Sequence, residues 1–175
     1  MLGKEHRLLV LPLALDRMTV LKVLRLYLNN FESLVPGIEK LRSCHSMNLS
    51  SNRLSTLPAF PAAHSLTSLD LSNNKFVEFP DSISEISALL VLNLSQNLLL
   101  EIPSCTALLT QLTLLDISRN SIDTLHPRFW LMTSLEVLKL NHNSMGSIRP
   151  LEADSIYATK KNQVKILTDT TPIKQ

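Results

Sequence analysis

The chain has 175 residues, enough for one domain, and 45% of them are hydrophobic, so it can form a continuous apolar core. Its formal net charge is +2, with 17 basic and 15 acidic residues distributed along the sequence. This balance provides no basic field of the kind that holds a phosphate backbone, and we expect no nucleic-acid partner.

Glycine, cysteine and histidine are too sparse or too scattered for several kinds of site. The 3 glycines stand apart from one another, which excludes a glycine-rich loop for nucleotides. The 2 cysteines, Cys44 and Cys105, form no C-x-x-C motif, and the 5 histidines show no H-x-x-x-H spacing. We therefore predict no metal site, no cofactor and no disulfide framework.

The opening segment, residues 1–20, contains an apolar run at 8–15 behind basic residues, as a secretory signal peptide does. Pro12 interrupts this run, no small-x-small cleavage site follows it, and it is too short to span a bilayer. Leu11-Pro12 also stands ten residues before Leu21, as Ile102-Pro103 stands ten residues before Leu112. We interpret residues 1–20 as a partial N-terminal repeat or cap remnant, as in a fragment or truncated isoform, with secretion as the minor alternative.

Residues 21–150 contain six copies of one pattern, L-x-x-L-x-L-x-x-N-x-L. The copies begin, 22 or 23 residues apart, at Leu21, Cys44, Leu66, Leu89, Leu112 and Leu135. Their ninth position is always asparagine: Asn29, Asn52, Asn74, Asn97, Asn120 and Asn143. After each copy comes an apolar residue and then proline, either at once (Pro58, Pro80, Pro103) or one residue later (Pro36, Pro127, Pro150). Such a period predicts a solenoid, because one unit cannot bury its apolar face alone.

Each copy predicts a short strand, because the alternation L-x-L buries one face. Stacked copies would form a parallel sheet with neighbouring strands about 4.8 Å apart. The asparagine would turn the chain out of the strand and form a structural ladder, its amide satisfying backbone groups of the adjacent coil. Between strands, residues 82–88 and 127–133 suit short helical turns, with Ser and Asp near their starts as caps.

The six copies resemble the leucine-rich repeat superfamily, and the 23-residue period with its Leu-Pro step is similar to the intracellular Ras-group subclass of signalling scaffolds. The departures are Cys44 and Met47 at leucine positions and the displaced prolines of the first, fifth and sixth copies. The resemblance implies an α/β solenoid, the leucine-rich repeat horseshoe, with a parallel concave sheet and short helical or 3₁₀ convex segments. Residues 151–175 lose the period, and we expect a polar, partly disordered C-terminal tail in which Ile156 and Tyr157 cover the last repeat.

The functional surface of such a curved stack is normally its concave face, formed by the variable positions around each L-x-L. We expect solvent-exposed, unobstructed side chains at these positions to bind a protein. The selected site residues are Arg25, Tyr27, Asn48, Asp70, Asn93, Asp116, Arg119, Lys139 and His142. Tyrosine and arginine among them are types that dominate interface energetics.

Catalytic interpretations of these residues are weaker. Asp70 and Asp116 would lie about 10 Å apart on an open sheet, which favours two solvated aspartates over an acid and base pair. His142 would stand two repeats from Ser95 and beside Arg119, so no nucleophile and base meet. Cys44 takes a core leucine position, and Cys105 has no basic neighbour to activate it.

We therefore predict a non-enzymatic protein-interaction module, an intracellular signalling scaffold or adaptor that is monomeric alone and not inserted in a membrane. The cytoplasmic location follows from the lack of the cysteine-rich caps that extracellular members of the superfamily usually have. One alternative is a regulatory or substrate-recognition fragment of a larger enzyme assembly of phosphatase or ubiquitin-ligase type. Another is a secreted receptor fragment, which would carry glycan on Asn48 or Asn93.

Overall fold

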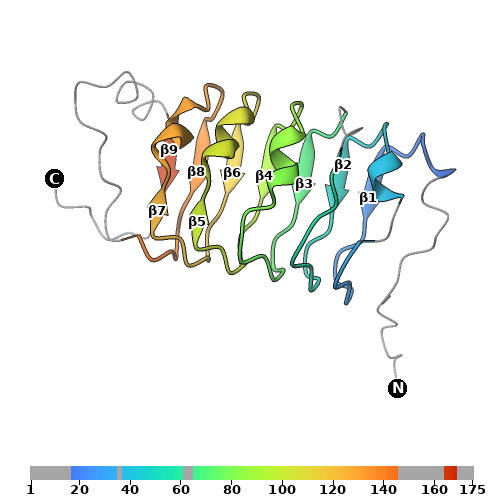
Figure 1. Cartoon of the computed structure of the whole chain (residues 1–175), viewed down its shortest axis with the longest axis horizontal. Coiled ribbons are helices and arrows are strands. Elements are labelled where there is room, and N and C mark those ends of the chain that lie inside the picture. Colours follow the sequence, from blue (N-terminus) through green and yellow to red (C-terminus); the bar gives the residue numbers. More distant parts are fainter. Residues whose placement is uncertain (1–16, 35–36, 61–64, 146–163, 169–175) are drawn as a thin grey trace.

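A computed structural model of the chain describes residues 17–34, 37–60, 65–145 and 164–168. The strands are β1 (Val23–Arg25), β2 (Ser46–Asn48), β3 (Ser68–Asp70), β4 (Val91–Asn93), β5 (Glu101–Ile102), β6 (Leu114–Asp116), β7 (Thr124–Leu125), β8 (Val137–Lys139) and β9 (Lys165–Leu167). The 3₁₀ turns are η2 (Ile38–Lys40), η3 (Asp81–Glu85), η4 (Ser104–Leu108) and η5 (Pro127–Leu131). Each repeat forms one coil of a solenoid, and the coils stack along the long axis of the molecule (Figure 1).

One face of the solenoid is a parallel sheet of seven strands in the order β1-β2-β3-β4-β6-β8-β9. Neighbouring strands pair at equivalent repeat positions, so that Leu69 of β3 stands opposite Leu92 of β4, and Leu92 opposite Leu115 of β6. The 3₁₀ turns lie on the other side of the stack, in front of the strands in the view of Figure 1. The predicted α/β solenoid, with a parallel sheet and short 3₁₀ segments, is confirmed.

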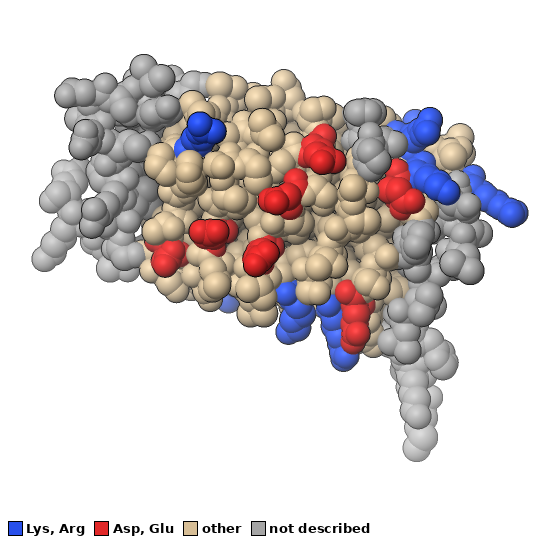
Figure 2. All heavy atoms as spheres, viewed as in Figure 1, with Lys and Arg blue, Asp and Glu red and all other residues tan. Residues whose placement is uncertain are grey.

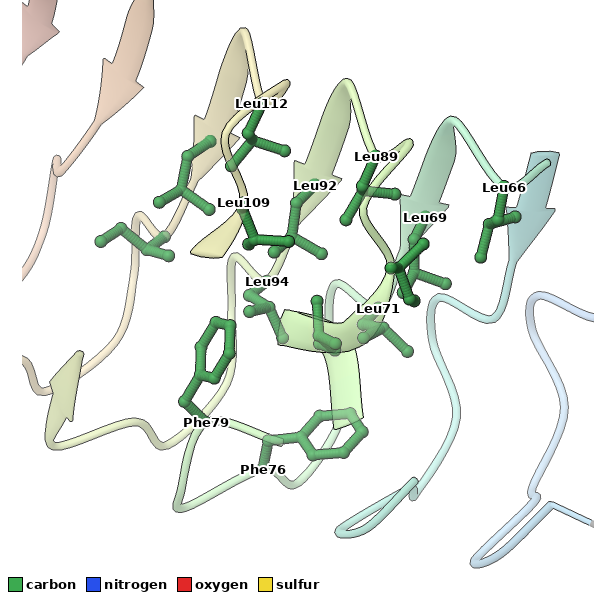
Figure 3. Packing of buried hydrophobic residues seen from close by; sticks show 14 of the residues in the cluster. Leu66, Leu69, Leu71, Phe76, Phe79, Leu89, Leu92, Leu94, Leu109 and Leu112 are labelled. Atoms are coloured by element: carbon green, nitrogen blue, oxygen red, sulfur yellow. The ribbon is translucent and has the colours of Figure 1, made fainter. Parts of the chain in front are cut away.

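The core is a single cluster that runs between the sheet and the return segments. Leucines from successive coils lie one beside the next, as Leu66, Leu89 and Leu112 do, while Phe76 and Phe79 fill the space under the return segments (Figure 3). Cys44 and Met47 are both buried at their leucine positions. Toward the last repeats the rings of Phe129 and Trp130 pack edge to face, with centroids 5.2 Å apart.

The short turns differ from the sequence expectation in their capping. η3 begins one residue before the predicted segment and follows Pro80, whose side chain cannot cap, so the predicted Ser or Asp cap is wrong there. At η5 the cap is His126, whose Nδ1 accepts a 3.1 Å hydrogen bond from the backbone N–H of Arg128. Proline has no backbone N–H. A proline at or beside the first position of these turns therefore leaves fewer unsatisfied donors for a side-chain cap to bind.

Two further strand pairings were not predicted, although Ile102 of β5 and Leu125 of β7 stand 23 residues apart, in register with the repeat. β5 and β7 form a separate two-stranded parallel sheet on the return side of the fourth and fifth repeats. β9 pairs in parallel with β8, Ile166 standing opposite Leu138, and so extends the main sheet within the segment expected to be a tail. The opening apolar run, Pro36, Pro150, Ile156 and Tyr157 lie outside the described residues.

Candidate functional site: the sheet face and its supporting turns

The asparagine column forms a continuous ladder of hydrogen bonds beneath the sheet. Asn97 is typical: its Nδ2 donates to the carbonyl oxygens of Leu94, in its own coil, and of Leu71, in the preceding coil, at 3.0 and 3.1 Å. Its Oδ1 accepts a 3.2 Å bond from the backbone N–H of Phe76. Equivalent bonds to the preceding coil are made by Asn52, Asn74, Asn120 and Asn143. Asn29 of the first repeat donates to Leu26 in its own coil.

Immediately before each asparagine, the backbone takes a left-handed conformation. The six residues there have φ between 52° and 57°: Leu28, Ser51, Asn73, Gln96, Arg119 and His142. A non-glycine residue in this region is strained, and each carries that strain where the chain leaves the strand. Arg119 and His142, two of the predicted site residues, are therefore exposed side chains of this turn rather than of the strands.

The predicted site residues at the last position of each strand are partly committed to the fold. In β3, Oδ1 of Asp70 accepts hydrogen bonds from the backbone N–H and the Oγ of Ser72, at 3.0 and 2.7 Å. Asn48 accepts the same pair from Ser50, and Asn93 accepts the backbone N–H of Ser95. These short side chains lock the strand into its following turn, and all three remain half-buried.

Asp116 does not match the expectation of a solvated carboxylate. It is 9% exposed, its Oδ1 accepts bonds from the N–H and Oγ of Ser118, and its Oδ2 lies 3.1 Å from Nζ of Lys139. Lys139 stands directly opposite Asp116 in the β6–β8 pair, and its side chain covers the carboxylate. Two residues predicted to face a partner thus satisfy each other, because the next repeat places a cation directly beside this carboxylate.

The remaining site residues are more open. Arg25 and Tyr27 are exposed at the first strand, Tyr27 by 48%. Within the described residues Asp70 forms no ion pair. Its carboxylate therefore differs from that of Asp116, which is paired with Lys139. The structure therefore leaves two open zones, one at Arg25 and Tyr27 and one around Asp70.

A column that the sequence reasoning missed completes this face. The first position of each strand shares the side of its last position, and in register it runs Val23, Ser46, Ser68, Val91, Leu114 and Val137. Val91, Leu114 and Val137 stand next to one another in register and are half-buried. The signal was present: residues two apart in a strand point to the same face. The first-position column of the sheet face is thus polar in repeats 2 and 3 and apolar in repeats 4 to 6, whereas the last-position column beside it is polar or charged throughout.

The chemistry of the described groups is limited. Asp70 and Asp116 stand two strands apart with β4 between them, roughly 10 Å at ordinary strand spacing. No three His, Cys, Asp or Glu side chains of the described segments meet as potential metal ligands. Both thiols are free, and burial raises the pKa of Cys44 and of Cys105. A raised thiol pKa disfavours the reactive thiolate.

Comparison with known proteins agrees with the geometry. The family described as leucine rich repeat matches residues 64–122. Over 86 residues the chain is 34% identical to leucine-rich repeat and calponin homology domain-containing protein 1 of Mus musculus. That match takes in 49% of this chain and 12% of the mouse protein, so the matched part spans about an eighth of that protein's length. In the described segments, no helix has the length and apolar character needed to cross a membrane.

Two solved structures share the architecture. A leucine-rich repeat protein of Leptospira interrogans superposes with a TM-score of 0.76 at 25% identity, over 91% of this chain and 40% of that one. The leucine-rich repeat ectodomain of the plant membrane receptor kinase GASSHO1/SCHENGEN3 of Arabidopsis thaliana, solved in complex with Casparian strip integrity factor 2, gives 0.63 at 28% identity, over 77% and 17%. Repeats of this type indicate a protein-interaction module and are typically non-catalytic. From its repeat sequence, its stacked coils and these relatives, the chain is a leucine-rich repeat protein.

Proposed function

We propose that the chain is a non-catalytic protein-binding module, an intracellular scaffold or adaptor that holds a folded partner against its seven-stranded sheet. The observation that carries this proposal is the sheet face itself, where polar and charged residues at the strand ends lie beside an apolar column at Val91, Leu114 and Val137. An interface of this kind combines apolar contact with polar groups that fix the orientation of the partner.

The rigidity of the face supports the same function. The asparagine ladder fixes each coil to the preceding one, and the serine bonds to Asn48, Asp70 and Asp116 fix the strand ends. A preorganised surface loses little conformational entropy when it binds, so more of the contact energy appears as affinity. The similar plant ectodomain was solved in complex with Casparian strip integrity factor 2, so a repeat stack of this kind can hold a separate ligand.

The intracellular location is part of the proposal, and its support is the pair of free thiols, one of them inside the core. The chain expressed in cultured cells with a different tag at each end should remain in the cell lysate, carry both tags and lack glycan. A shortened, glycosylated product in the medium would contradict this location.

Binding through the sheet face is tested by quantitative affinity capture from cell lysate. The test variant combines Tyr27→Ala, Asp70→Asn and Val91→Ser, which remove side-chain contacts from the polar and the apolar parts of the face. Asparagine is chosen at 70 because it retains the Oδ1 acceptor for Ser72, as Asn48 does for Ser50. We expect the principal captured proteins to fall by about tenfold or more, as for loss of interface hot spots.

The control variant is Glu85→Gln on the exposed part of η3, on the other side of the solenoid, which should capture as the wild type does. Thermal melts of both variants check that neither change unfolds the chain. Equal capture by all three proteins, or loss of capture by Glu85→Gln alone, would show that the sheet face is not the binding surface.

A further inference from the structure

The return side of the solenoid carries a groove that the proposed sheet-face function does not use. It has a volume of about 580 Å³ and extends over residues 77–81, 100–103 and 123, hence over the third, fourth and fifth repeats. Its apolar lining includes Val77, Phe79, Leu100 and Pro103. Phe79 belongs to the core, whereas Val77 and Leu100 are 46% and 56% exposed. Two large aliphatic side chains in one groove thus remain open to solvent.

The polar lining of the groove has one sign of charge. Glu78, Asp81, Glu101 and Asp123 line it, and all four are exposed. Neither of the ion pairs given by the described side chains, Arg53 with Glu32 and Lys139 with Asp116, involves them. Asp81 accepts a weak 3.4 Å bond from the Cys105 thiol, which supplies no charge.

The charge of this region also departs from that of the whole chain. Residues 76–127 contain 6 acidic residues and 1 basic residue, a balance of −5, although the full sequence carries +2. Figure 2 shows acidic side chains across the middle of the face that bears the 3₁₀ turns, with most Lys and Arg at its margins. Carboxylates gathered around a groove attract cations and increase their association rate.

We infer that this groove is a second interaction surface, and that it binds a short extended segment of a partner protein in which Arg or Lys residues alternate with aliphatic residues. The aliphatic side chains cover Val77 and Leu100, and the cationic side chains reach the surrounding carboxylates. A lone metal ion or a small polyamine would leave the exposed aliphatic side chains uncovered. A purely apolar segment would desolvate the carboxylates without pairing them, which is costly.

The dimensions of the groove fit such a segment. Three coils at ordinary parallel-strand spacing span about 10 Å, and an extended peptide advances about 3.3 Å per residue, so roughly three to five residues cross it. Alternate residues of an extended peptide face the same way, which places two aliphatic side chains about 7 Å apart on the groove side. The long arginine side chains between them can bend back to the carboxylates.

The test measures binding of the fluorescein-labelled peptide Gly-Arg-Leu-Arg-Leu-Arg-Gly to the full chain by fluorescence anisotropy. Two companion peptides replace the arginines with glutamate or the leucines with serine. We expect the first peptide to bind, its affinity to fall as salt is added, and both companions to bind at least about threefold more weakly. Nitrogen-15 amide shifts on titration should concentrate at residues 77–81, 100–105 and 123.

Variants of the chain separate the groove from general electrostatic attraction. Glu78→Gln with Glu101→Gln, and Leu100→Ser alone, should each weaken the peptide roughly three- to tenfold, as expected for exposed ion pairs and one aliphatic contact. The matched control, Glu32→Gln with Glu136→Gln, removes the same charge from exposed positions outside the groove and should leave binding unchanged.

Three results would overturn the inference: no binding of the arginine-leucine peptide, equal weakening by the groove and control carboxylate pairs, or undiminished binding by Leu100→Ser. Melting curves establish that each variant is folded. The sheet-face variant with Tyr27, Asp70 and Val91 replaced should bind the peptide normally, which keeps this groove experimentally distinct from the proposed sheet-face site.

Discussion

Replacing Asn97 with alanine should lower the free energy of unfolding by about 2 kcal/mol, within the range of about 1 to 3 kcal/mol for an orphaned buried polar group. Asn97 is 6% exposed, and its Oδ1 accepts the backbone N–H of Phe76, itself fully buried. No water can replace that acceptor without opening the coil. The lost carbonyl bonds cost less, because Leu71 O still accepts from Asn74 and Leu94 O still accepts from Asn120.

Urea unfolding followed by circular dichroism measures this change. An unchanged slope of the free energy of unfolding against urea concentration would show that the variant exposes the same surface on unfolding as the wild type does. Asn93→Ala is the matched control, four residues away in the same coil. It removes a half-exposed bond to the N–H of Ser95 and should cost less than about 1 kcal/mol. Equal losses for the two variants, or an unchanged midpoint for Asn97→Ala, would refute the assignment of the ladder as the buried connection between coils.

Three further predictions concern the left-handed turn at Gln96, the Asp116–Lys139 pair and the two thiols. Gln96→Gly should stabilise the chain by up to about 1 kcal/mol and Gln96→Val should destabilise it, because φ is 56° there and only glycine takes this conformation without strain; thermal melts of both variants check the opposite signs. Lys139→Met should cost about 1 to 2 kcal/mol in urea unfolding, because it leaves the largely buried Asp116 carboxylate without its cation. Burial raises the pKa of both thiols, so at pH 8 the native chain should react with Ellman's reagent more slowly than free cysteine does, and Cys44 should react only after unfolding, whereas Cys105 should react first.

The sequence by itself determined the solenoid, because its apolar columns recur in register and can be buried only by stacking one coil on the next. The positions of β1 to β4, β6 and β8 follow from that period, as do the inward leucines and the asparagine at each turn. The apolar column at Val91, Leu114 and Val137 could also have been predicted, because residues two apart in a strand point to the same face.

Only the tertiary structure decided which of the outward side chains are available to a partner. Alternation along a strand sets the direction of Asp70 and Asp116 alike, yet Asp116 is covered by Lys139 from a coil 23 residues later, whereas Asp70 is not. The same holds for the return side, where Val77 and Leu100 come from different repeats and meet in one groove. The pairing of β9 with β8 also depends on contacts between distant segments, for which the local pattern contains no period. Direction is a local property of the backbone, but exposure and charge pairing depend on the neighbouring coils.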